Sequence, residues 1–554
     1  MTRRTLAQMI PTLATLMAAD TAPSRDQLKQ SLSMLGLEFK DEQLDMMLPG
    51  LTRSLASYAS LRKIEIPPET EPAISFSPML SGMSLPSGKR PFRQSKAGKL
   101  PAWKNVEDLA FWPASQLGQL VRSKKISSTE LTKMYLARLK KHSPTLLCTI
   151  TLTEDMALEQ AKQADADQRR GKYHGPLHGL PYGAKDLFAV KGYKTTWGAE
   201  PYVDQQFDYT ATVIERLTAA GAVLCAKLSM GALAQGGLWF GGMTKTPWNI
   251  EQTSSGSSAG SASATAAGLV AFALGTETLG SIVSPATRCG VTGLRPTFGR
   301  VPRTGAMALS WTMDKVGPIC RTVEDCMLVL RVIDGPDGKD MAARYPNAIE
   351  WQAAAPVAKL KVGVLREDFA RNTDESRKKH YDDALAALAK TGVQLIDTKL
   401  PEFPSRDLVL MLNVEAGAAF DDLTRNGGVE KLSGQKPQDW PNSFRSSRMT
   451  PAVEYIRAAR ARTILMRQFH EYLAGFDALV SPTGSMSLTI TNLTGQPQIV
   501  VPCGFPNNDP MGLLFTGHLF EEGKLSRIAK AYQDATDWHQ KQPPGFNTQS
   551  FASA

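Results

Sequence analysis

Short apolar runs alternate with longer stretches of helical periodicity along most of the chain. The short runs have the length and the aliphatic content of buried strands, while the longer stretches place apolar side chains every three or four positions. This alternation predicts an α/β fold, in which helices cover the faces of a β-sheet. Examples of the strand-like runs are GAVLCAKL (221–228), LKVGVL (360–365), DALVSP (477–482) and QIVVPCG (498–504), and examples of the helical stretches are residues 376–391 and 449–474.

The N-terminal fifth of the chain has a different pattern. Residues 25–65 are predicted to form a small helical module, since apolar residues such as Leu44 and Leu48 recur at helical spacing. Residues 66–105 are rich in Pro, Ser and Gly and carry a basic run, which predicts an extended linker. The α/β domain is therefore expected to span residues 106–554.

Residues 1–24 allow two interpretations. A basic start, a modest apolar stretch and the small residues near Ala18–Ala22 fit a weak export signal, and Thr2-Arg3-Arg4 resembles a twin-arginine signal. An ordinary amphipathic helix explains the same residues equally well. The sequence therefore leaves open whether the protein is cytoplasmic or exported.

The overall composition is that of a globular protein, with 554 residues, of which 42% are apolar and 21% charged. The net charge is +10, and six basic residues with no acidic one lie between Lys89 and Lys104. A solvated linker explains this run better than a nucleic-acid site does, so no nucleic-acid partner is expected. No apolar run approaches the roughly 20 residues of a membrane span, so no stable membrane insertion is expected.

The six cysteines and seven histidines form no recognisable metal motif. No two cysteines have CxxC spacing, and no histidine pair has HExxH spacing. We therefore expect scattered buried thiols and no metal site.

The stretch EQTSSGSSAGSASATAAG (251–268) consists almost entirely of Gly, Ala and Ser. It is a poor linker, since a strand-like run follows at once, and it lacks the GxxxxGK[ST] pattern of a phosphate loop. Gly256–Gly260 matches the GxSxG elbow of α/β-hydrolases, with Ser258 as nucleophile. That elbow must follow a strand, whereas the preceding residues look like a loop, so this alternative is disfavoured.

Two further stretches carry candidate chemistry. In Gly275–Arg300, Ser281 follows Gly280 on a tight loop after an apolar run, where backbone N–H groups can converge on an oxyanion. In Gly175–Gly198, Lys185 stands among apolar and small residues. A lone lysine is usually a surface residue, but three such stretches together indicate an active site.

Together these residues resemble the amidase signature family over residues 106–546. The family's Lys-Asp motif appears as Lys185-Asp186, its Ser-rich motif as SGSSAGS (255–261), and its nucleophile motif as GTETLGSIV (275–283). The C-terminal stretches DALVSPT, NLTGQPQIVVPCGF and AYQDATDWHQKQPP also look like segments of the family. The resemblance implies an α/β amidase signature fold with a mixed central β-sheet flanked by helices, here preceded by the helical module.

The resemblance also implies a mechanism and a role for each motif residue. A Ser-Ser-Lys triad would hydrolyse a carboxamide through an acyl-serine intermediate, release ammonia or an amine, and need no cofactor. The peptide bond between Gly256 and Ser257 would be cis. The implied residues are Ser281 as nucleophile, Ser257 as proton relay and Lys185 as base, with Thr278, Leu279, Gly280 and Ser281 as the backbone oxyanion hole and Gly256, Ser258 and Thr276 in support.

The chain departs from the family pattern at several of these positions. Ser255 and Ala259 replace glycines, and Glu277 replaces an aspartate. Leu279 replaces a glycine beside the nucleophile and could narrow the acyl pocket. Val283 replaces an arginine, so an ion pair with the acidic position is expected to be lost, unless Arg288 substitutes for it.

A second resemblance concerns the helical module and the linker. They look like the small helical C subunit of tRNA-dependent amidotransferases, which ends in an extended tail along the amidase subunit; an unrelated helical appendage is the alternative. Four functions follow for the whole chain: a stand-alone amidase of a small-molecule amide, a glutaminase-type subunit of a tRNA-dependent amidotransferase, an inactive scaffold, and an esterase that uses Ser258. The sequence does not define the oligomeric state, and a homodimer remains open.

Overall fold

The computed structural model describes residues 23–547, except residues 62, 65, 68, 69, 71, 73, 86–89, 97, 99, 347 and 348. The prediction of an export signal concerns residues that lie almost entirely outside this part of the chain. The described residues belong to two compact units, one within residues 1–70 and one within residues 71–554. No helix in the described part is both long enough and apolar enough to cross a bilayer.

The first unit is a pair of helices, α2 (Arg25–Met34) and α3 (Asp41–Leu61). Ser24 begins α2 with a capping box, in which its hydroxyl accepts from the Gln27 N–H and the Gln27 side chain accepts from the Ser24 N–H. The sequence pattern predicted a helical module here without locating a turn in it; in the structure the chain turns at Gly36, where φ is +68°. The small core of this unit consists of Leu28, Leu32 and Leu44.

The second unit is built on a mixed sheet of 11 strands, as predicted. Parallel and antiparallel pairs both occur: β3 is parallel to β4 and β9, whereas β10 and β11 are antiparallel to their neighbours. In spatial order the strands are β14 (Gln394–Thr398), β13 (Lys361–Leu365), β15 (Ala478–Pro482), β17 (Met511–Thr516), β16 (Gln498–Gly504), β10 (Thr292–Arg295), β11 (Lys315–Cys320), β9 (Phe272–Glu277), β3 (Pro181–Lys185), β4 (Val223–Leu228) and β2 (Thr149–Leu152).

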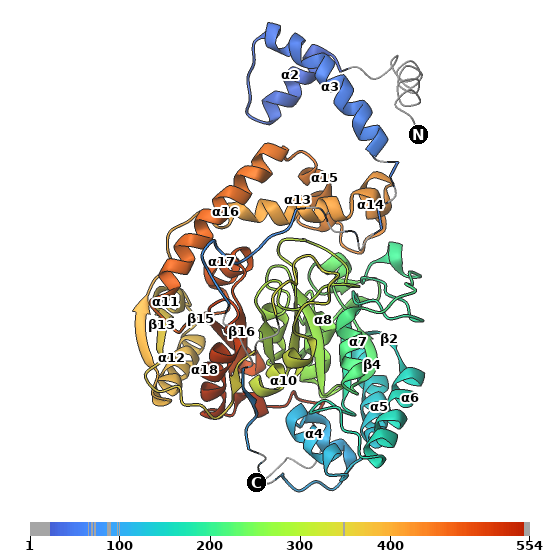
Figure 1. The fold of residues 1–554 in the computed structure, drawn as a ribbon, viewed down its shortest axis with the longest axis vertical. Coiled ribbons are helices and arrows are strands. Elements are labelled where there is room, and N and C mark those ends of the chain that lie inside the picture. Colours follow the sequence, from blue (N-terminus) through green and yellow to red (C-terminus); the bar gives the residue numbers. More distant parts are fainter. Residues whose placement is uncertain are drawn as a thin grey trace. The chain divides into compact units, whose positions relative to one another are not determined.

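Helices cover both faces of this sheet, and its inner strands β3, β4, β11, β16 and β17 are therefore buried on both sides. Along β11, Ile319 joins a core cluster with α8 and α9, whereas Val316 and Cys320 join the larger cluster that includes α10. Figure 1 shows the helices distributed around the sheet. Their bounds are α4 (Ala114–Arg122), α5 (Ser128–Leu146), α6 (Glu154–Arg169), α7 (Thr212–Ala219), α8 (Ala259–Ala266), α9 (Val283–Cys289), α10 (Val323–Ile333), α11 (Arg366–Ala370), α12 (Glu375–Lys390), α13 (Leu410–Ala419), α14 (Asp421–Arg425), α15 (Trp440–Ser447), α16 (Ala452–Leu473), α17 (Met486–Thr494) and α18 (Glu522–Asp534).

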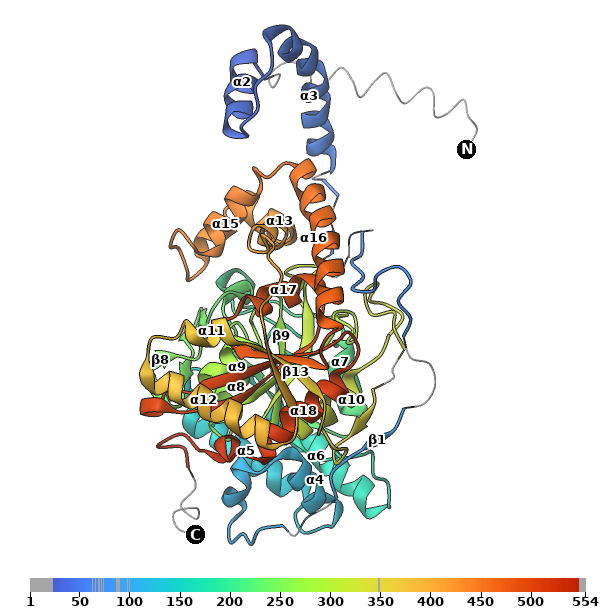
Figure 2. The same cartoon turned by 90° about the vertical axis from the view of Figure 1, so that its left-hand side faces the viewer.

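Two groups of helices flank opposite parts of the sheet. Helices α13, α15 and α16 pack together at one end of the unit, next to α17 (Figure 1). Helices α12 and α18 lie against the sheet beside β16 and β17 (Figure 2). Three short strand pairs lie outside the main sheet: β1 (Phe92–Arg93) with β12 (Trp351–Gln352), β5 (Leu238–Trp239) with β6 (Gly242–Met243), and β7 (Lys245–Thr246) with β8 (Asn249–Thr253).

Candidate active site

Lys185 is the last residue of β3, which is the third strand from one edge of the main sheet. Because β3 and β9 run parallel and pair side by side, both strands end at the same edge of the sheet. The Lys185 amine therefore lies beside Thr276 of β9 and donates to its hydroxyl oxygen at 2.9 Å. Gly183 permits this packing, since a Cβ atom there would come within 2.4 Å of the Leu228 side chain. The strand thus carries a lysine into the interior.

The Ser-rich motif forms the loop before α8. Its peptide bond between Gly256 and Ser257 is cis, as the resemblance implied. The loop lies so close to the segment around Gly236 that a Cβ on Gly256 would come within 1.8 Å of the Gly236 carbonyl oxygen. Gly260 is crowded in the same way, since a Cβ atom there would come within 2.3 Å of the Cys148 carbonyl oxygen. The small side chains of Gly, Ala and Ser therefore let neighbouring segments of the backbone approach this loop closely.

The Lys185 amine is surrounded by hydroxyl groups. Besides Thr276, it donates to the Ser257 hydroxyl at 2.7 Å and to the Ser258 hydroxyl at 3.2 Å. Lys185 has no exposed surface, and burial lowers the pKa of its amine to about 7, against the opposing charges of Asp314 and Glu277. A substantial fraction of this lysine is therefore neutral near neutral pH, which is the form that can accept a proton.

Ser281 lies on the loop between β9 and α9. It is 9% exposed, compared with 1% for Ser257 and none for Lys185, so it is the member of the predicted triad that solvent reaches best. Its carbonyl oxygen accepts from the Ser258 N–H at 3.2 Å, which ties the two serine loops together. Within the described residues, no hydrogen bond joins the Ser281 hydroxyl to Ser257 or Lys185. The structure thus brings Lys185 and Ser257 into direct contact and places Ser281 on the adjoining loop.

The predicted oxyanion loop leads into Ser281. In the described part of the chain, the N–H groups of Leu279, Gly280 and Ser281 take part in no hydrogen bond with other protein groups. Gly280 has a φ of +84°, which an L side chain rarely adopts. Leu279 is partly buried and packs against the main core. At the start of the loop, the Thr278 hydroxyl donates to the Asp314 carboxylate at 2.6 Å.

Glu277 anchors the loop on its other side. One carboxylate oxygen accepts from the N–H groups of Ile282 (2.8 Å) and Val283 (3.0 Å), just after the nucleophile position. The other oxygen accepts from Arg295 at 2.9 Å and from Asn492 at 2.8 Å. Burial alone would raise the pKa of Glu277, but the Arg295 charge and these donors lower it to about 2. The carboxylate stays charged and holds the loop at both ends.

This arrangement corrects one expectation from the sequence. The acidic position keeps an ion pair although Val283 replaces the family's arginine, because Arg295 of β10 provides the charge. Arg288, the suggested substitute, pairs instead with Asp509 at the surface. Arg295 could have been found from the sequence, since an arginine within an apolar strand needs a buried partner.

We expect Arg295→Ala to lower the free energy of unfolding by about 3–5 kcal/mol, because it leaves the buried Glu277 carboxylate without its partner. Chemical denaturation of the purified variant measures this change. Arg288→Ala is the matched control, since its ion pair is partly exposed and should contribute no more than about 1 kcal/mol. Equal losses in the two variants would contradict the anchoring role of the buried pair.

A second buried lysine supports the end of β3. Lys227 of β4 and Asp186 form an ion pair of 2.7 Å, and neither side chain is exposed. The same aspartate accepts from the Thr196 N–H at 2.8 Å and from its hydroxyl. The two residues of the Lys-Asp motif therefore have different partners: Lys185 faces the serines, and Asp186 fixes the backbone behind it. Lys227 lies in the strand-like run GAVLCAKL and is not among the residues predicted for the site, since no motif marks it.

Ser258 does not have the surroundings of a hydrolase elbow. Its hydroxyl is fully buried, donates to the Thr276 carbonyl at 3.0 Å and accepts from the Thr276 N–H at 3.1 Å. The sequence suggested a loop before Ser258, but the structure has the hairpin of β7 and β8 there. This hairpin lies outside the main sheet, so the required strand, turn and helix of the sheet are not present there.

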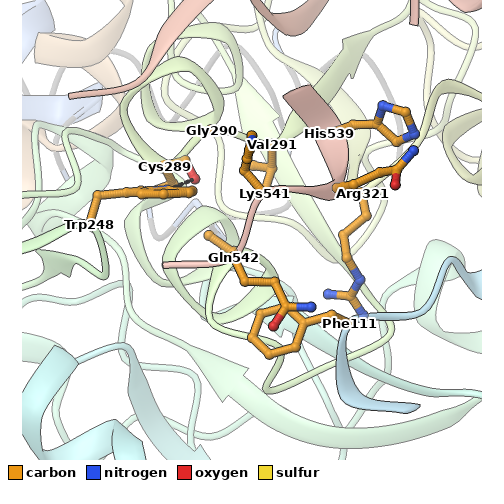
Figure 3. A pocket seen from close by; sticks show the side chains of 11 residues that line it. Phe111, Trp248, Cys289, Gly290, Val291, Arg321, His539, Lys541 and Gln542 are labelled. Atoms are coloured by element: carbon orange, nitrogen blue, oxygen red, sulfur yellow. Dashed lines mark hydrogen bonds between the residues drawn. The ribbon is translucent and has the colours of Figure 1, made fainter. Parts of the chain in front are cut away.

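Two cavities lie elsewhere in this unit. One has a volume of about 20 Å³, enough for a water molecule, and Figure 3 shows it between Trp248, Cys289 and the C-terminal residues His539 and Lys541. The other, of about 390 Å³, lies at the carboxyl ends of β13 and β14. Neither is lined by the predicted triad. Separately, the described residues contain no group of three or more His, Cys, Asp or Glu side chains that could hold a metal ion.

Comparison with known proteins identifies the family of this chain. Residues 130–525 match the family model described as Amidase. The chain is 33% identical over 479 residues to the A subunit of glutamyl-tRNA(Gln) amidotransferase from Coxiella burnetii (strain Dugway 5J108-111), and the match covers 77% of this chain and 98% of that protein. It is 34% identical over 475 residues to the same subunit of Roseiflexus castenholzii (strain DSM 13941 / HLO8), covering 77% and 96%.

Among solved structures, the native peptide amidase from Stenotrophomonas maltophilia superposes with a TM-score of 0.71 at 29% identity, covering 80% of this chain and 100% of that chain. The family match spans more than half of the sequence and includes all three stretches of the candidate site. The chain therefore belongs to the amidase signature family and is a hydrolase that acts on amides.

Proposed function

We propose that this protein hydrolyses the carbon–nitrogen bond of a carboxamide through an acyl-serine intermediate on Ser281, with Ser257 as proton relay and Lys185 as base. The observation that carries the proposal is the Lys185 amine, which is fully buried, lies 2.7 Å from the Ser257 hydroxyl, and has a pKa lowered by burial to about 7. A serine hydroxyl is a weak nucleophile until a base removes its proton.

In the first half of the reaction, neutral Lys185 takes the proton of Ser257, and Ser257 takes that of Ser281. The Ser281 oxygen then forms a bond to the amide carbon, and the carbonyl oxygen becomes an oxyanion. The N–H groups of the loop from Thr278 to Ser281 would donate to it, and those of Leu279, Gly280 and Ser281 have no competing partner in the described structure. The intermediate collapses when the carbon–nitrogen bond breaks and the leaving nitrogen receives the proton held by Lys185 through Ser257.

In the second half, water replaces the amine. The base takes a proton from water, the water oxygen bonds to the acyl carbon, and the bond to Ser281 breaks as its oxygen regains a proton. The products are a carboxylic acid and ammonia or an amine. Every proton in this cycle passes through groups of the chain itself or through water.

A glutaminase-type subunit is the second candidate, because the relatives that cover 77% of the chain are A subunits of glutamyl-tRNA(Gln) amidotransferase. It predicts hydrolysis of glutamine and a stable complex with another protein. We favour the stand-alone amidase, since the chain carries a fused helical unit of its own ahead of the region that matches the family. The structure of a peptide amidase with this fold makes peptide amides useful test substrates.

The proposal is tested by labelling with a fluorophosphonate probe, followed by peptide mapping. We expect the label on Ser281 in the wild-type protein and its loss in Ser281→Ala. Hydrolysis is then compared for glutamine, peptide amides and small carboxamides. Labelling of Ser258, or no labelling of a folded protein, would reject the assignment, and a marked preference for glutamine would favour the second candidate.

A further inference from the structure

The nucleophile loop rests on two supports that come from distant parts of the chain. On one side, Asp314 accepts from the Thr278 hydroxyl at 2.6 Å, and also from the N–H groups of Leu309 (2.8 Å) and Ser310 (3.0 Å). On the other side, Asn492 of α17 donates to Glu277 at 2.8 Å. The segment 309–314 and the helix α17 therefore determine where the residues from Glu277 to Ser281 lie.

One guanidinium group joins these two supports. Arg462 of α16 is only 2% exposed. It donates to the hydroxyl (2.9 Å) and to the carbonyl (2.8 Å) of Thr312, and to the carbonyl of Leu493, the neighbour of Asn492. Thr312 lies two residues before Asp314, and Leu493 is next to Asn492. A shift of this guanidinium would therefore displace both supports of the nucleophile loop.

Glu415 of α13 completes the junction. Its carboxylate accepts from the Ser310 hydroxyl at 2.8 Å and from the N–H (3.0 Å) and hydroxyl (2.7 Å) of Thr312. It also accepts from the Tyr455 hydroxyl at 2.8 Å. Helices α13 and α16 thus hold the segment 309–314 in place by buried hydrogen bonds from a carboxylate and a guanidinium group.

The linker covers this junction with an aromatic ring. The centroid of the Phe76 ring lies 3.5 Å from the central carbon of the Arg462 guanidinium. The ring also meets Phe298 edge-on, at a centroid distance of 5.0 Å. The main chain just after α17 lies close to the same ring, since a Cβ atom on Gly495 would come within 3.6 Å of it. Figure 1 draws this part of the linker in blue. Its neighbours hold it there, since Ser77 shares a hydrogen bond of 2.6 Å with Tyr345.

We propose that Phe76 is a positioning residue for the nucleophile loop: its ring covers the Arg462 guanidinium and keeps the supports of that loop in place. This inference rests on the proposed function and gives the predicted linker a role in the chemistry. An aromatic face attracts a cation electrostatically, and the attraction is strongest where water is excluded. Without it, water reaches the guanidinium and competes for Thr312 and Leu493, so the oxyanion donors lose their fixed position.

Two substitutions of Phe76 distinguish the effect of its aromatic face from the effect of its apolar bulk. Phe76→Leu keeps an apolar side chain but removes the aromatic face, whereas Phe76→Tyr keeps the face. We expect kcat to fall by about 10- to 100-fold in Phe76→Leu, because small displacements of catalytic groups have effects of that size, and to stay within about 2-fold in Phe76→Tyr. KM should change little in either variant. Ile74→Ala is the control in the same segment, since Ile74 is 73% exposed.

The readout is kcat per labelled Ser281, together with the rate of fluorophosphonate labelling, so that misfolded protein does not count. Equal kcat in Phe76→Leu and wild type, or an equal loss in Phe76→Leu and Phe76→Tyr, overturns the role of the aromatic face. A wild-type protein that is not labelled on Ser281 rejects the proposed function itself, and this inference with it. The two failures are therefore distinguishable.

Discussion

Replacing Ser281 by alanine is expected to lower kcat for amide hydrolysis by about 10⁴- to 10⁶-fold, with a much smaller change in KM. The substitution removes the oxygen that forms the acyl bond, and no other hydroxyl of the site can take its place. Ser257 is the relay and is 1% exposed, while Ser258 is fully buried with its hydroxyl bonded to Thr276. Steady-state kinetics on the best amide of the substrate panel measures the loss.

Ser258→Ala is the matched control for this experiment. Its hydroxyl supports the loop and touches the Lys185 amine at 3.2 Å, so we expect a loss of about 10-fold, the value of one or two ordinary hydrogen bonds. The reverse result, an inactive Ser258→Ala and an active Ser281→Ala, would show that the protein works as a GxSxG hydrolase. Residual activity of Ser281→Ala near the wild-type level would exclude the acyl-serine mechanism on this residue.

Replacing Lys185 by methionine is expected to lower kcat/KM by about 10²- to 10⁴-fold, the usual contribution of a positioned general base. The pH profile of the wild-type protein tests the role of Lys185 more directly than the loss of rate in the variant does. Burial lowers the pKa of the Lys185 amine to about 7, so the amine is protonated and inactive as a base below that pH and neutral above it. The rate should therefore rise through pH 7 and level off on the alkaline side.

In Lys185→Met this rise should disappear, because the titrating group is gone. Thr276→Val is a suitable control, since Thr276 accepts from the same amine at 2.9 Å but is not in the proposed proton path. It should lower the rate by less than about 10-fold and keep the alkaline rise. A rate maximum at acid pH in the wild type, or the same pH profile in Lys185→Met, would contradict the role of this lysine.

The local pattern of the sequence predicted much of the architecture. The four strand-like runs contain β4, β13, β15 and β16, and residues 376–391 correspond to α12. These elements were predictable because helical periodicity and the continuous apolar runs of buried strands are visible in the local sequence. The pattern did not locate the turn at Gly36 within the helical module, since helical periodicity on both sides hides a turn of a few residues between two helices.

The candidate site was predicted only as a set of residue types on three stretches. The motifs indicated Lys185, Ser257 and Ser281, but not how closely they meet. The sequence could not determine how far the pKa of Lys185 is lowered either, because that pKa depends on how completely the amine is removed from water. The parallel pairing of β3 with β9 and the close approach of Gly256 to the segment at Gly236 produce that burial.

Only the tertiary structure decided which residues form hydrogen bonds and ion pairs with the site and its supports. Asn492 reaches Glu277 across 215 positions of the chain, and Arg462 reaches Thr312 across 150. No periodicity links positions so far apart, and a buried charge can be paired by any opposite charge that the fold brings near it. The sequence by itself therefore determined the elements and the reactive residue types, while the folding of distant segments onto one another determined their surroundings, which control their chemistry.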